Sequence, residues 1–524
     1  MNWDTLVIGS GIGGLTAAAA LAREGQRVLV LEQHDILGGM TQTFARQGFS
    51  FGTGLHYLTG VTAPGDDEAR FARLLNTLGD GTLRFQPLPD RFDLVRLIHP
   101  DGTETRFAYG APESDNWARL KAQFPAEGAA IDAYADQYEQ ARRSINTMMA
   151  LHGVPRPAAT LMRWVLGRRL QRRADVTLAE ALAHVRDPQL RAILAARGGD
   201  YGLPPSHAPL VLHALVMGSY AEGGAGYPIG GPARLAESLA AGVWNAGGEL
   251  RTGARVAQLL VEDGRAVGVR LADGREERAP HIVSAMGALN TIAALPDGVA
   301  ADWRASIRRH EPSCACMTLY LGFSGAADEL RALGFDGANH WIYDGQATGA
   351  APDPDPEALI WANPTDEDAG ALYVSFSGLN DPEHAQAPTA EVLALCDWEV
   401  FAAWQDSRLG HRPEDYEATK GWIEDQLLTQ FKRLFPTLAQ RVAYHELSTP
   451  LSQAAYALAP EGAMYGLATT PERLLDPALH VRTPVPGLLL AGQDVASLGV
   501  EGAAMGGLMA AATLKPALWK LMKG

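Results

Sequence analysis

The sequence predicts an α/β protein, in which a doubly wound parallel sheet forms a nucleotide-binding domain that mixed α+β segments interrupt. Three observations predict this fold class. A short apolar strand at residues 5–8 runs directly into a glycine-rich loop and an alanine-rich helix. A second apolar strand at 27–31 ends on an acidic residue. Near the C-terminus, an apolar strand that ends in glycine, 487–492, leads into another helix rich in alanine and glycine.

The first loop, residues 9–14, has the spacing G-x-G-x-x-G immediately after a strand. Gly9 allows the tight turn, Gly11 lets backbone N–H groups approach a diphosphate, and Gly14 lets the helix pack closely on the sheet. The diphosphate is expected at the positive end of the helix dipole. Glu32 ends the second strand, where a carboxylate accepts hydrogen bonds from a ribose hydroxyl. The whole unit therefore predicts a dinucleotide site.

A second glycine pair, Gly38-Gly39, follows within one short loop and lets the backbone pass close to the rest of a dinucleotide. This extension resembles the FAD-binding half of the glutathione reductase and amine oxidase superfamily. The following residues sharpen the resemblance: Leu31-Glu32-Gln33-His34, Gly38-Gly39, Thr43-Phe44, Gly48-Phe49, Phe51, Thr53-Gly54 and His56-Tyr57. They are similar to the retinol saturase branch of the phytoene desaturase and carotenoid isomerase family. One departure is Gly52, which stands where an acidic residue is expected.

Two later segments resemble the other FAD-binding segments of this family. In the first, 223–285, the resemblance implies that Val256 lies beside the adenine. In the C-terminal segment it implies that Asp494 holds a ribityl hydroxyl, and that the amides of the next helix start face the pyrimidine carbonyl of the flavin. The cofactor implied is FAD, and the binding residues implied are Gly9, Gly11, Ile12, Gly13, Gly14, Glu32, Gln33, Gly38, Gly39, Met40, Thr41, Gly54, Leu55, Val256, Gly492, Asp494, Val500, Gly502 and Ala503.

The predicted FAD-binding domain comprises residues 1–80, 223–288 and 481–524, and the predicted substrate domain comprises 81–222 and 289–480. Within the substrate domain, alternating residues from 92 to 98 predict a hairpin, and 116–151, 391–404 and 416–435 are expected to be mostly helical. The sequence holds no second glycine loop in a strand–loop–helix setting, so a separate NAD(P)H domain is not expected. An external electron donor or acceptor is therefore expected.

The resemblance implies redox or isomerising chemistry at carbon–carbon double bonds of long apolar substrates, such as carotenoids, retinoids or unsaturated acyl chains. In a saturase, reduced flavin delivers hydride to one alkene carbon while an acid protonates the other, and a desaturase runs the reaction backwards. Two residues are candidates for a catalytic role. Glu501 lies beside the helix start and donates a proton if burial raises its pKa, whereas His56 lies in the loop after Gly54. Alternatively, Glu501 only caps the helix and His56 only bonds to backbone.

Three functions remain open at this stage. The first is a flavin-dependent alkene reductase of the retinol saturase kind, and the second is a desaturase or cis–trans isomerase of carotenoids or fatty acyl chains. The third is a prenyl-binding escort protein of the Rab GDP dissociation inhibitor type, which shares the fold without redox chemistry; the intact glycine loop, Glu32 and Asp494 argue against it. An amine oxidase is more distant. Its flavin is usually caged by aromatic residues, whereas here the neighbours are Ala491, Ala496 and Leu498.

Composition narrows the class of partner. The formal net charge of -16 argues against nonspecific nucleic-acid binding. No secretory signal precedes the first strand, and no uninterrupted apolar stretch is long enough to span a bilayer. A cytoplasmic protein is therefore expected, with any membrane contact peripheral. The three cysteines, Cys314, Cys316 and Cys396, predict neither a disulfide framework nor a metal site, and are expected to be buried structural thiols.

Residues 161–173 are the candidate for peripheral membrane contact. This segment holds Trp164 and other apolar residues beside five arginines, which anionic head groups attract. On a helical wheel, however, Leu161 and Arg172 project within about 20° of each other, so the two faces do not separate cleanly. The alternative is a solvated helix whose arginines pair with acidic neighbours.

Overall fold

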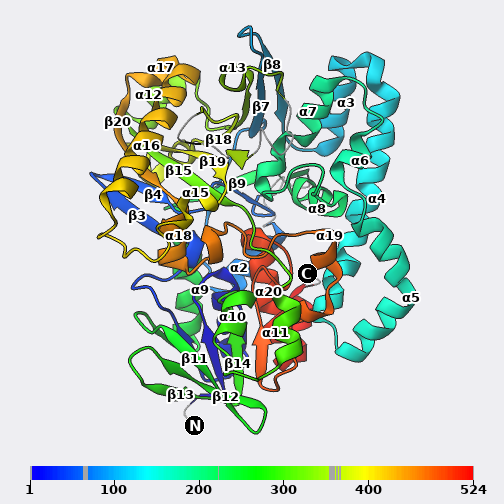
Figure 1. Ribbon diagram of the computed structural model, residues 1–524, viewed down its shortest axis with the longest axis vertical. Helices are drawn as coiled ribbons and strands as arrows, with labels where there is room; N and C mark the ends of the chain where they lie inside the picture. The colour runs from blue at the N-terminus through cyan, green and yellow to red at the C-terminus, as the bar shows by residue number, and fades with distance from the viewer. Residues whose placement is uncertain are drawn as a thin grey trace.

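The computed structural model describes residues 3–62, 69–221, 224–352, 360–361, 364 and 367–522. Its lower half in Figure 1 is built on a five-stranded parallel sheet in the order β10-β2-β1-β14-β21. These strands are β1 (Thr5–Ile8), β2 (Val28–Leu31), β10 (Glu249–Arg251), β14 (His281–Ser284) and β21 (Leu488–Leu490). All four strand pairs are parallel, and three distant parts of the chain supply them. The predicted doubly wound fold is confirmed.

One face of this sheet is covered by helices that pack on one another. Helix α1 (Ile12–Arg23) contacts α9 (Ala233–Asn245), α20 (Gly499–Leu514) and α2 (Arg70–Leu78). The alanines of α1 are buried all around the helix, because small side chains let its neighbours approach on several sides. A three-stranded antiparallel sheet, β11 (Val256–Glu262), β12 (Arg265–Leu271) and β13 (Glu276–Arg278), contacts the central sheet through β12 and β14.

Glycines let the two ends of the chain meet backbone to backbone. A Cβ atom on Gly14 would lie 2.0 Å from the carbonyl oxygen of Gly9, so the helix could not pack on its own loop. A Cβ on Gly507, in α20, would lie 2.0 Å from the carbonyl oxygen of Gly13. Gly13 in turn lies against Gly492, where an added Cβ would be 2.8 Å from the Cα. The C-terminal segment is therefore packed directly on the N-terminal glycine loop.

The upper half of the molecule is built on an eight-stranded mixed sheet in the order β20-β15-β19-β18-β16-β7-β8, with β17 paired to β19. Its strands are β7 (Asp93–Ile98), β8 (Glu104–Tyr109), β15 (Ala315–Phe323), β16 (Asn339–Asp344), β17 (Ile360–Trp361), β18 (Ala371–Ser375), β19 (Thr389–Cys396) and β20 (Val442–Ser448). The antiparallel pair β7–β8 is the predicted hairpin. Figure 1 shows two groups of helices beside this sheet, one formed by α3 to α8 and the other around α16.

The first group comprises α3 (Glu113–Gln123), α4 (Gly128–Gly153), α5 (Arg156–Ala174), α6 (Leu178–Leu182), α7 (Pro188–Ala195) and α8 (Leu210–Ala221). The second comprises α12 (Ala327–Ala332), α15 (Glu399–Ala402), α16 (Glu414–Leu434) and α17 (Pro436–Ala439). The helices predicted at 116–151 and 416–435 are confirmed. The single helix predicted at 391–404 is wrong, because its first part, 391–396, lies in β19 and only the short helix α15 forms in the rest. This strand is buried along nearly its whole length, so its apolar residues show no period of two.

The remaining elements connect the two halves. Strands β3 (Thr43–Arg46) and β4 (Phe49–Gly52) form a hairpin, and β5 (Leu58–Thr59), β9 (Ala225–Pro228) and β6 (Phe85–Pro87) form a small sheet. Short helices are α10 (Ala288–Ala293), α11 (Ala301–Ile307), α13 (Gly345–Thr348), α18 (Pro450–Ala457) and α19 (Pro471–Leu475). The predicted domain boundaries stay a prediction, and the one at 222/223 lies outside the described residues.

The contact between the chain ends makes a stability prediction. We expect Gly507→Ala to lower the free energy of unfolding by about 1–3 kcal/mol, because the new methyl group meets a backbone carbonyl that cannot move aside. Gly421→Ala is the matched control. Gly421 lies within α16 with no atom near the added methyl group, so alanine is expected to stabilise the helix by about 0.5–1 kcal/mol. Urea unfolding followed by circular dichroism measures both, and equal effects would contradict the packing argument.

Candidate active site

A cavity lies between the two large sheets. On one side it is lined by Ile8 and Leu31, which end β1 and β2, and on the other by Trp341, Tyr373 and Leu393 of β16, β18 and β19. Ligands of open parallel sheets bind outside the C-terminal ends of the strands. The cavity therefore lies where the sequence predicts a dinucleotide, and it extends from there to the upper sheet.

Most of the predicted site residues line this cavity. They are Gly9, Gly11, Ile12, Gly13, Glu32, Gln33, Gly38, Gly39, Met40, Thr41, Gly54, His56, Val256, Gly492, Asp494, Val500 and Ala503. Gly14, Leu55 and Gly502 do not line it. Leu55 is buried, and the two glycines serve packing, since a Cβ on Gly502 would lie 2.1 Å from the carbonyl oxygen of Ser497.

Two helix N-termini open onto the cavity. Gly11 is the N-cap of α1, and among the described residues no side chain caps that helix and no acidic residue stands in its first turn. Val500 and Ala503, in the first turns of α20, also line the cavity, and no described side chain caps α20 either. Uncapped N-terminal amides carry partial positive charge and donate hydrogen bonds to anionic groups. This donor set fits a diphosphate at α1 and an electron-rich group at α20.

Glu32 fixes the glycine loop to the end of β2. Ser10 donates two hydrogen bonds to Oε2 of Glu32, from its backbone N–H at 2.8 Å and from its hydroxyl at 2.6 Å. The backbone N–H of His34 donates to the other oxygen, Oε1, at 2.8 Å. The carboxylate is thus held rigidly at the cavity wall, and its remaining lone-pair capacity is available to a ligand hydroxyl.

Asp494 is a second carboxylate at the cavity wall, and it follows β21 as Glu32 follows β2. Its carboxylate accepts hydrogen bonds from the backbone N–H groups of Ala288, at 2.7 Å, and Leu467, at 3.0 Å. Arg473 lies 3.9 Å away and donates to the carbonyl oxygens of Leu467 and Gln493. Asp494 therefore joins three loops around the cavity and presents a fixed carboxylate to it.

The wall of the cavity near the upper sheet is apolar and aromatic. Trp341 and Tyr373 pack with their ring centroids 4.4 Å apart, and the Tyr373 ring lies 5.3 Å from that of His56. Ile342, Leu372, Leu393 and Leu395 complete this part of the wall, which we call the aromatic chamber together with Trp341 and Tyr373. Such a surface suits a long hydrocarbon ligand.

His56 faces a buried carboxylate at the chamber. Its Nδ1 atom lies 3.7 Å from Oε2 of Glu391, a β19 residue that is 1% exposed. The hydroxyl of Ser377 donates to the same oxygen at 2.6 Å. In the described part of the chain, neither Nδ1 of His56 nor Oε1 of Glu391 has a hydrogen-bond partner. The two groups are thus close to each other, and each keeps hydrogen-bonding capacity that no described group uses.

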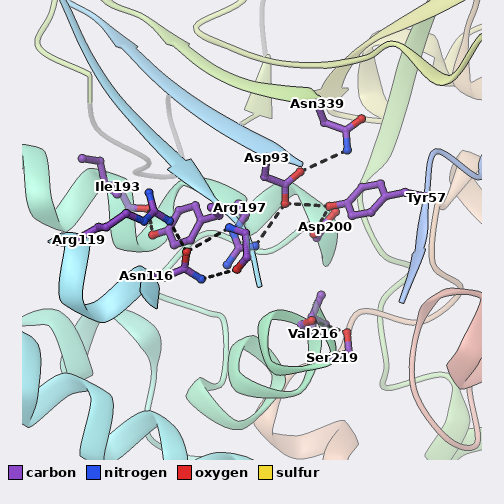
Figure 2. Close-up of polar contacts among 12 residues, drawn as sticks. Tyr57, Asp93, Asn116, Arg119, Ile193, Arg197, Asp200, Val216, Ser219 and Asn339 are labelled. Atoms are coloured by element: carbon purple, nitrogen blue, oxygen red, sulfur yellow. Dashed lines mark hydrogen bonds and ion pairs between the residues drawn. The ribbon is translucent and has the colours of Figure 1, made fainter. Parts of the chain in front are cut away.

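Figure 2 shows a second polar cluster, built around Asp93, Arg197, Asp200 and Tyr57. The Tyr57 hydroxyl lies 3.2 Å from Oδ2 of Asp93 and 3.4 Å from Oδ2 of Asp200. Arg197 pairs with Asp93 at 3.3 Å, and Asn339 donates to Asp93 at 3.3 Å. Asp93 is fully buried, whereas Asp200 lines the cavity. Burial and the neighbouring Asp93 carboxylate raise the pKa of Asp200 to about 7, although Arg197 opposes the shift.

A sequence model of the flavin containing amine oxidoreductase family matches residues 12–515. The chain belongs to this family. It is therefore a flavin oxidoreductase, and the uncapped helix ends with the two fixed carboxylates, Glu32 and Asp494, are the features of this structure that fit a flavin nucleotide. The prediction of an enzyme rather than an escort protein is confirmed.

Known proteins agree with the predicted resemblance. The all-trans-retinol 13,14-reductase of Rattus norvegicus is 32% identical to this flavin oxidoreductase, over 98% of this chain and 85% of the relative. The chloroplastic prolycopene isomerase of Arabidopsis thaliana is 27% identical, over 97% of this chain and 82% of the relative. The crystal structure of an oxidoreductase from Methanosarcina mazei shares the fold, with a TM-score of 0.62 at 18% identity, over 99% of this chain and 100% of that chain.

Glu501, the other predicted proton donor, does not lie in the buried environment that this role requires. It lies in the first turn of α20, as the sequence indicates, but its side chain is exposed and does not line the cavity. The structure therefore brings His56 to the cavity and leaves Glu501 outside it. Gly52, the departure from the family pattern, is explained by packing, because a Cβ there would lie 2.9 Å from the Pro232 ring.

The functional candidates that sequence reasoning missed are Asp200 and Glu391. Neither lies in a motif. Asp200 lines the cavity, whereas Glu391 lies beside His56, which lines it, and both positions depend on contacts between distant segments. Glu391 was hidden in a segment predicted as a helix, although the apolar and β-branched residues of β19 were a signal for a strand. Asp200 follows two glycines, which marks a turn but not a site.

Helix α5 contains the predicted membrane-contact segment. Leu161, Trp164 and Val165 are 59%, 84% and 61% exposed. Among the described residues, no carboxylate pairs with Arg168, Arg169, Arg172 or Arg173; Arg173 donates to Gln140 instead. The predicted alternative, in which acidic neighbours neutralise the arginines, is therefore not what the helix shows. No helix in the described ranges is both long enough and apolar enough to cross a bilayer.

The raised pKa of Asp200 predicts a pH effect on stability. Between about pH 4 and pH 7 the folded chain keeps a proton on Asp200 that the unfolded chain releases, so stability must fall as pH rises through this window. We expect the thermal unfolding midpoint of the unmodified chain to fall relative to that of Asp200→Asn between about pH 4 and pH 7. Asp273→Asn is the control: Arg275 lowers the pKa of Asp273, so this exposed group stays ionised. Parallel curves for all three proteins would contradict the prediction.

Proposed function

We propose that this flavin oxidoreductase binds FAD and reduces a carbon–carbon double bond of a long apolar polyene of the retinoid or carotenoid class. One observation carries the proposal: a single cavity joins the nucleotide-type donors at the strand ends to the aromatic chamber. An apolar substrate in the chamber would thus lie next to a flavin. The retinol reductase named above supports this direction of reaction.

FAD, rather than a smaller flavin, fits the distribution of groups along the cavity. Glu32, the uncapped α1 terminus and Val256 suit the adenosine and diphosphate part. Asp494 and the α20 terminus, far away in sequence, suit the ribityl and ring part. In this proposal the segments 1–80, 223–288 and 481–524 hold FAD, and 81–222 with 289–480 hold the substrate.

When bound, reduced FAD supplies a hydride to one carbon of the double bond. The chain has to supply the proton for the other carbon, hold the polyene and exclude water. We propose His56 as the proton donor, because it lines the cavity beside the chamber and Glu391 lies behind its ring. An external donor would then restore the reduced flavin.

A second candidate function uses the same cavity. The similarity to a prolycopene isomerase favours cis–trans isomerisation of a carotenoid. Desaturation, which is the reverse of the proposed reduction, would use the same groups. Isomerisation needs no net electron flow, and desaturation reduces the flavin. The three reactions are therefore distinguished by the redox state of the flavin before and after one turnover.

The test is an anaerobic single turnover. The purified chain should show a flavin absorption band, and adding all-trans-retinol to the dithionite-reduced form should reoxidise the flavin with formation of a dihydro product. We expect His56→Gln to slow this step by about 10²–10⁴-fold with the flavin band unchanged. His445→Gln is the control, because His445 forms a similar pair with Glu424, at 2.6 Å, outside the cavity.

Other outcomes of this experiment separate the alternatives. An isomerised polyene with no net change in flavin absorbance would favour the isomerase, and bleaching of oxidised flavin by a more saturated polyene would favour the desaturase. A chain that neither carries nor takes up FAD would contradict the cofactor proposal. Equal slowing by His56→Gln and His445→Gln would remove His56 from the mechanism.

We propose in addition that α5 contacts an anionic membrane surface, from which an apolar substrate can enter. Trp164 and Val165 are exposed, and the same helix carries Arg168, Arg169, Arg172 and Arg173, to which the described residues offer no carboxylate partner. We expect the chain to co-sediment with phosphatidylglycerol vesicles more than with phosphatidylcholine vesicles, and Trp164→Ser with Val165→Ser to weaken binding about tenfold. Trp244→Ser, on α9, is the control, since Trp244 is 53% exposed. Equal binding to both kinds of vesicle, unchanged by the double substitution, would contradict this docking site.

A further inference from the structure

Three carboxyl groups line the described part of the cavity: Glu32, Asp494 and Asp200. The first two lie among the residues that fit the nucleotide and are held by backbone or hydroxyl donors. Asp200 belongs to a different region. Gly199, its neighbour in sequence, lies against Trp341, because an added Cβ there would be 2.9 Å from the indole ring. Asp200 is thus a polar group at the edge of the aromatic chamber that the proposed reaction does not yet use.

Among the described residues around Asp200, the one guanidinium forms its ion pair with another carboxylate. Arg197 is the guanidinium of this cluster, and it pairs with the buried Asp93. Tyr57 bridges the two carboxyl groups through its hydroxyl, 3.2 Å from Asp93 and 3.4 Å from Asp200 (Figure 2). The other titratable groups that influence Asp200 are the phenols of Tyr201, Tyr220, Tyr373 and Tyr465. Asp200 is therefore anchored from behind by a hydroxyl and has hydrogen-bonding capacity on the side of the cavity.

Contact between a carboxyl group in this position and a pure hydrocarbon is unfavourable. Covering the cavity side of the carboxyl group with an alkyl chain would remove water there and put no new hydrogen-bond partner in its place, at a cost of about 1–3 kcal/mol. An alcohol avoids this cost in both protonation states, because the acid donates to the hydroxyl oxygen and the carboxylate accepts from the hydroxyl hydrogen. The remaining wall of the chamber still suits an apolar chain.

We propose that Asp200 binds the terminal hydroxyl of a polyene alcohol, and that this contact makes the chamber select retinol-like alcohols over hydrocarbon polyenes. The proposal rests on the proposed function, since it takes the polyene class of substrate from there. It adds a reason for the choice of double bond. In retinol the hydroxyl stands on the carbon bonded to C14, so an anchor on the hydroxyl fixes the 13,14 double bond in one place.

The test measures binding without turnover. Fluorescence titration of the FAD-loaded, oxidised protein gives dissociation constants for all-trans-retinol and for its hydrocarbon analogue, in which a methyl group replaces the CH₂OH. We expect the unmodified chain to bind the alcohol about 10–100-fold more tightly. Asp200→Leu should bring the two dissociation constants close together, because it weakens binding of the alcohol and strengthens binding of the hydrocarbon. Asp200→Asn still donates and accepts hydrogen bonds, so it should restore part of the preference.

The outcomes separate this proposal from the proposed function. Equal binding of alcohol and hydrocarbon by the unmodified chain overturns the anchor, whatever the variants do. So does an alcohol preference that survives in Asp200→Leu; if that variant also loses single-turnover reduction, Asp200 acts on the reaction and not on recognition. If the unmodified chain prefers the alcohol through Asp200 but reduces no polyene, the anchor stands and the reductase proposal fails. Asp200→Asn guards against misfolding, because it keeps the size of the side chain.

Discussion

The close contact between the glycine loop and the C-terminal helix is the constraint on which the rest of the structure depends. Gly13 lies against Gly492 and Gly507 with backbone touching backbone, which side chains at these positions would prevent. This contact places the start of α1 and the start of α20 around one cavity, although hundreds of residues separate them in the chain. Two positive helix ends therefore open onto the same cavity, as the proposed binding of FAD requires.

Of the chain between these ends, β10 and β14 join the parallel sheet, whereas other segments form a second layer on the opposite side of the cavity. The eight-stranded sheet presents Trp341, Tyr373 and Leu393 to the cavity from three different strands. Glu391 lies two residues before Leu393 on β19, and its carboxylate reaches His56. The same strand thus supplies part of the apolar wall and the carboxylate beside the histidine, so the chemistry of the chamber depends on the register of the upper sheet.

The sequence predicts those parts of the fold and site whose signals lie in a few adjacent residues. The glycine loop, Glu32 and the C-terminal strand and helix are recognisable because each needs only a few adjacent residues to do its work. Asp200 and Glu391 could not be predicted in this way. Their neighbours in space, Tyr57 and His56, lie more than 140 residues away in sequence, and no spacing rule connects them. Predicting β19 as a helix removed the remaining clue, because a buried strand has no polar face to reveal its period.

The buried cluster of Asp93, Arg197 and Asp200 shows how specificity and stability oppose each other at this site. Taking two carboxyl groups and one guanidinium out of water is unfavourable, and replacing such groups by apolar residues often stabilises a protein. The cluster is nevertheless held in place by Tyr57 and Asn339, which position Asp93 and leave Asp200 at the cavity. A chamber made only to hold hydrocarbon would gain from an apolar residue at position 200. The Tyr57 hydroxyl meets this carboxyl group from one side, and under the proposal above a ligand hydroxyl meets it from the side of the cavity.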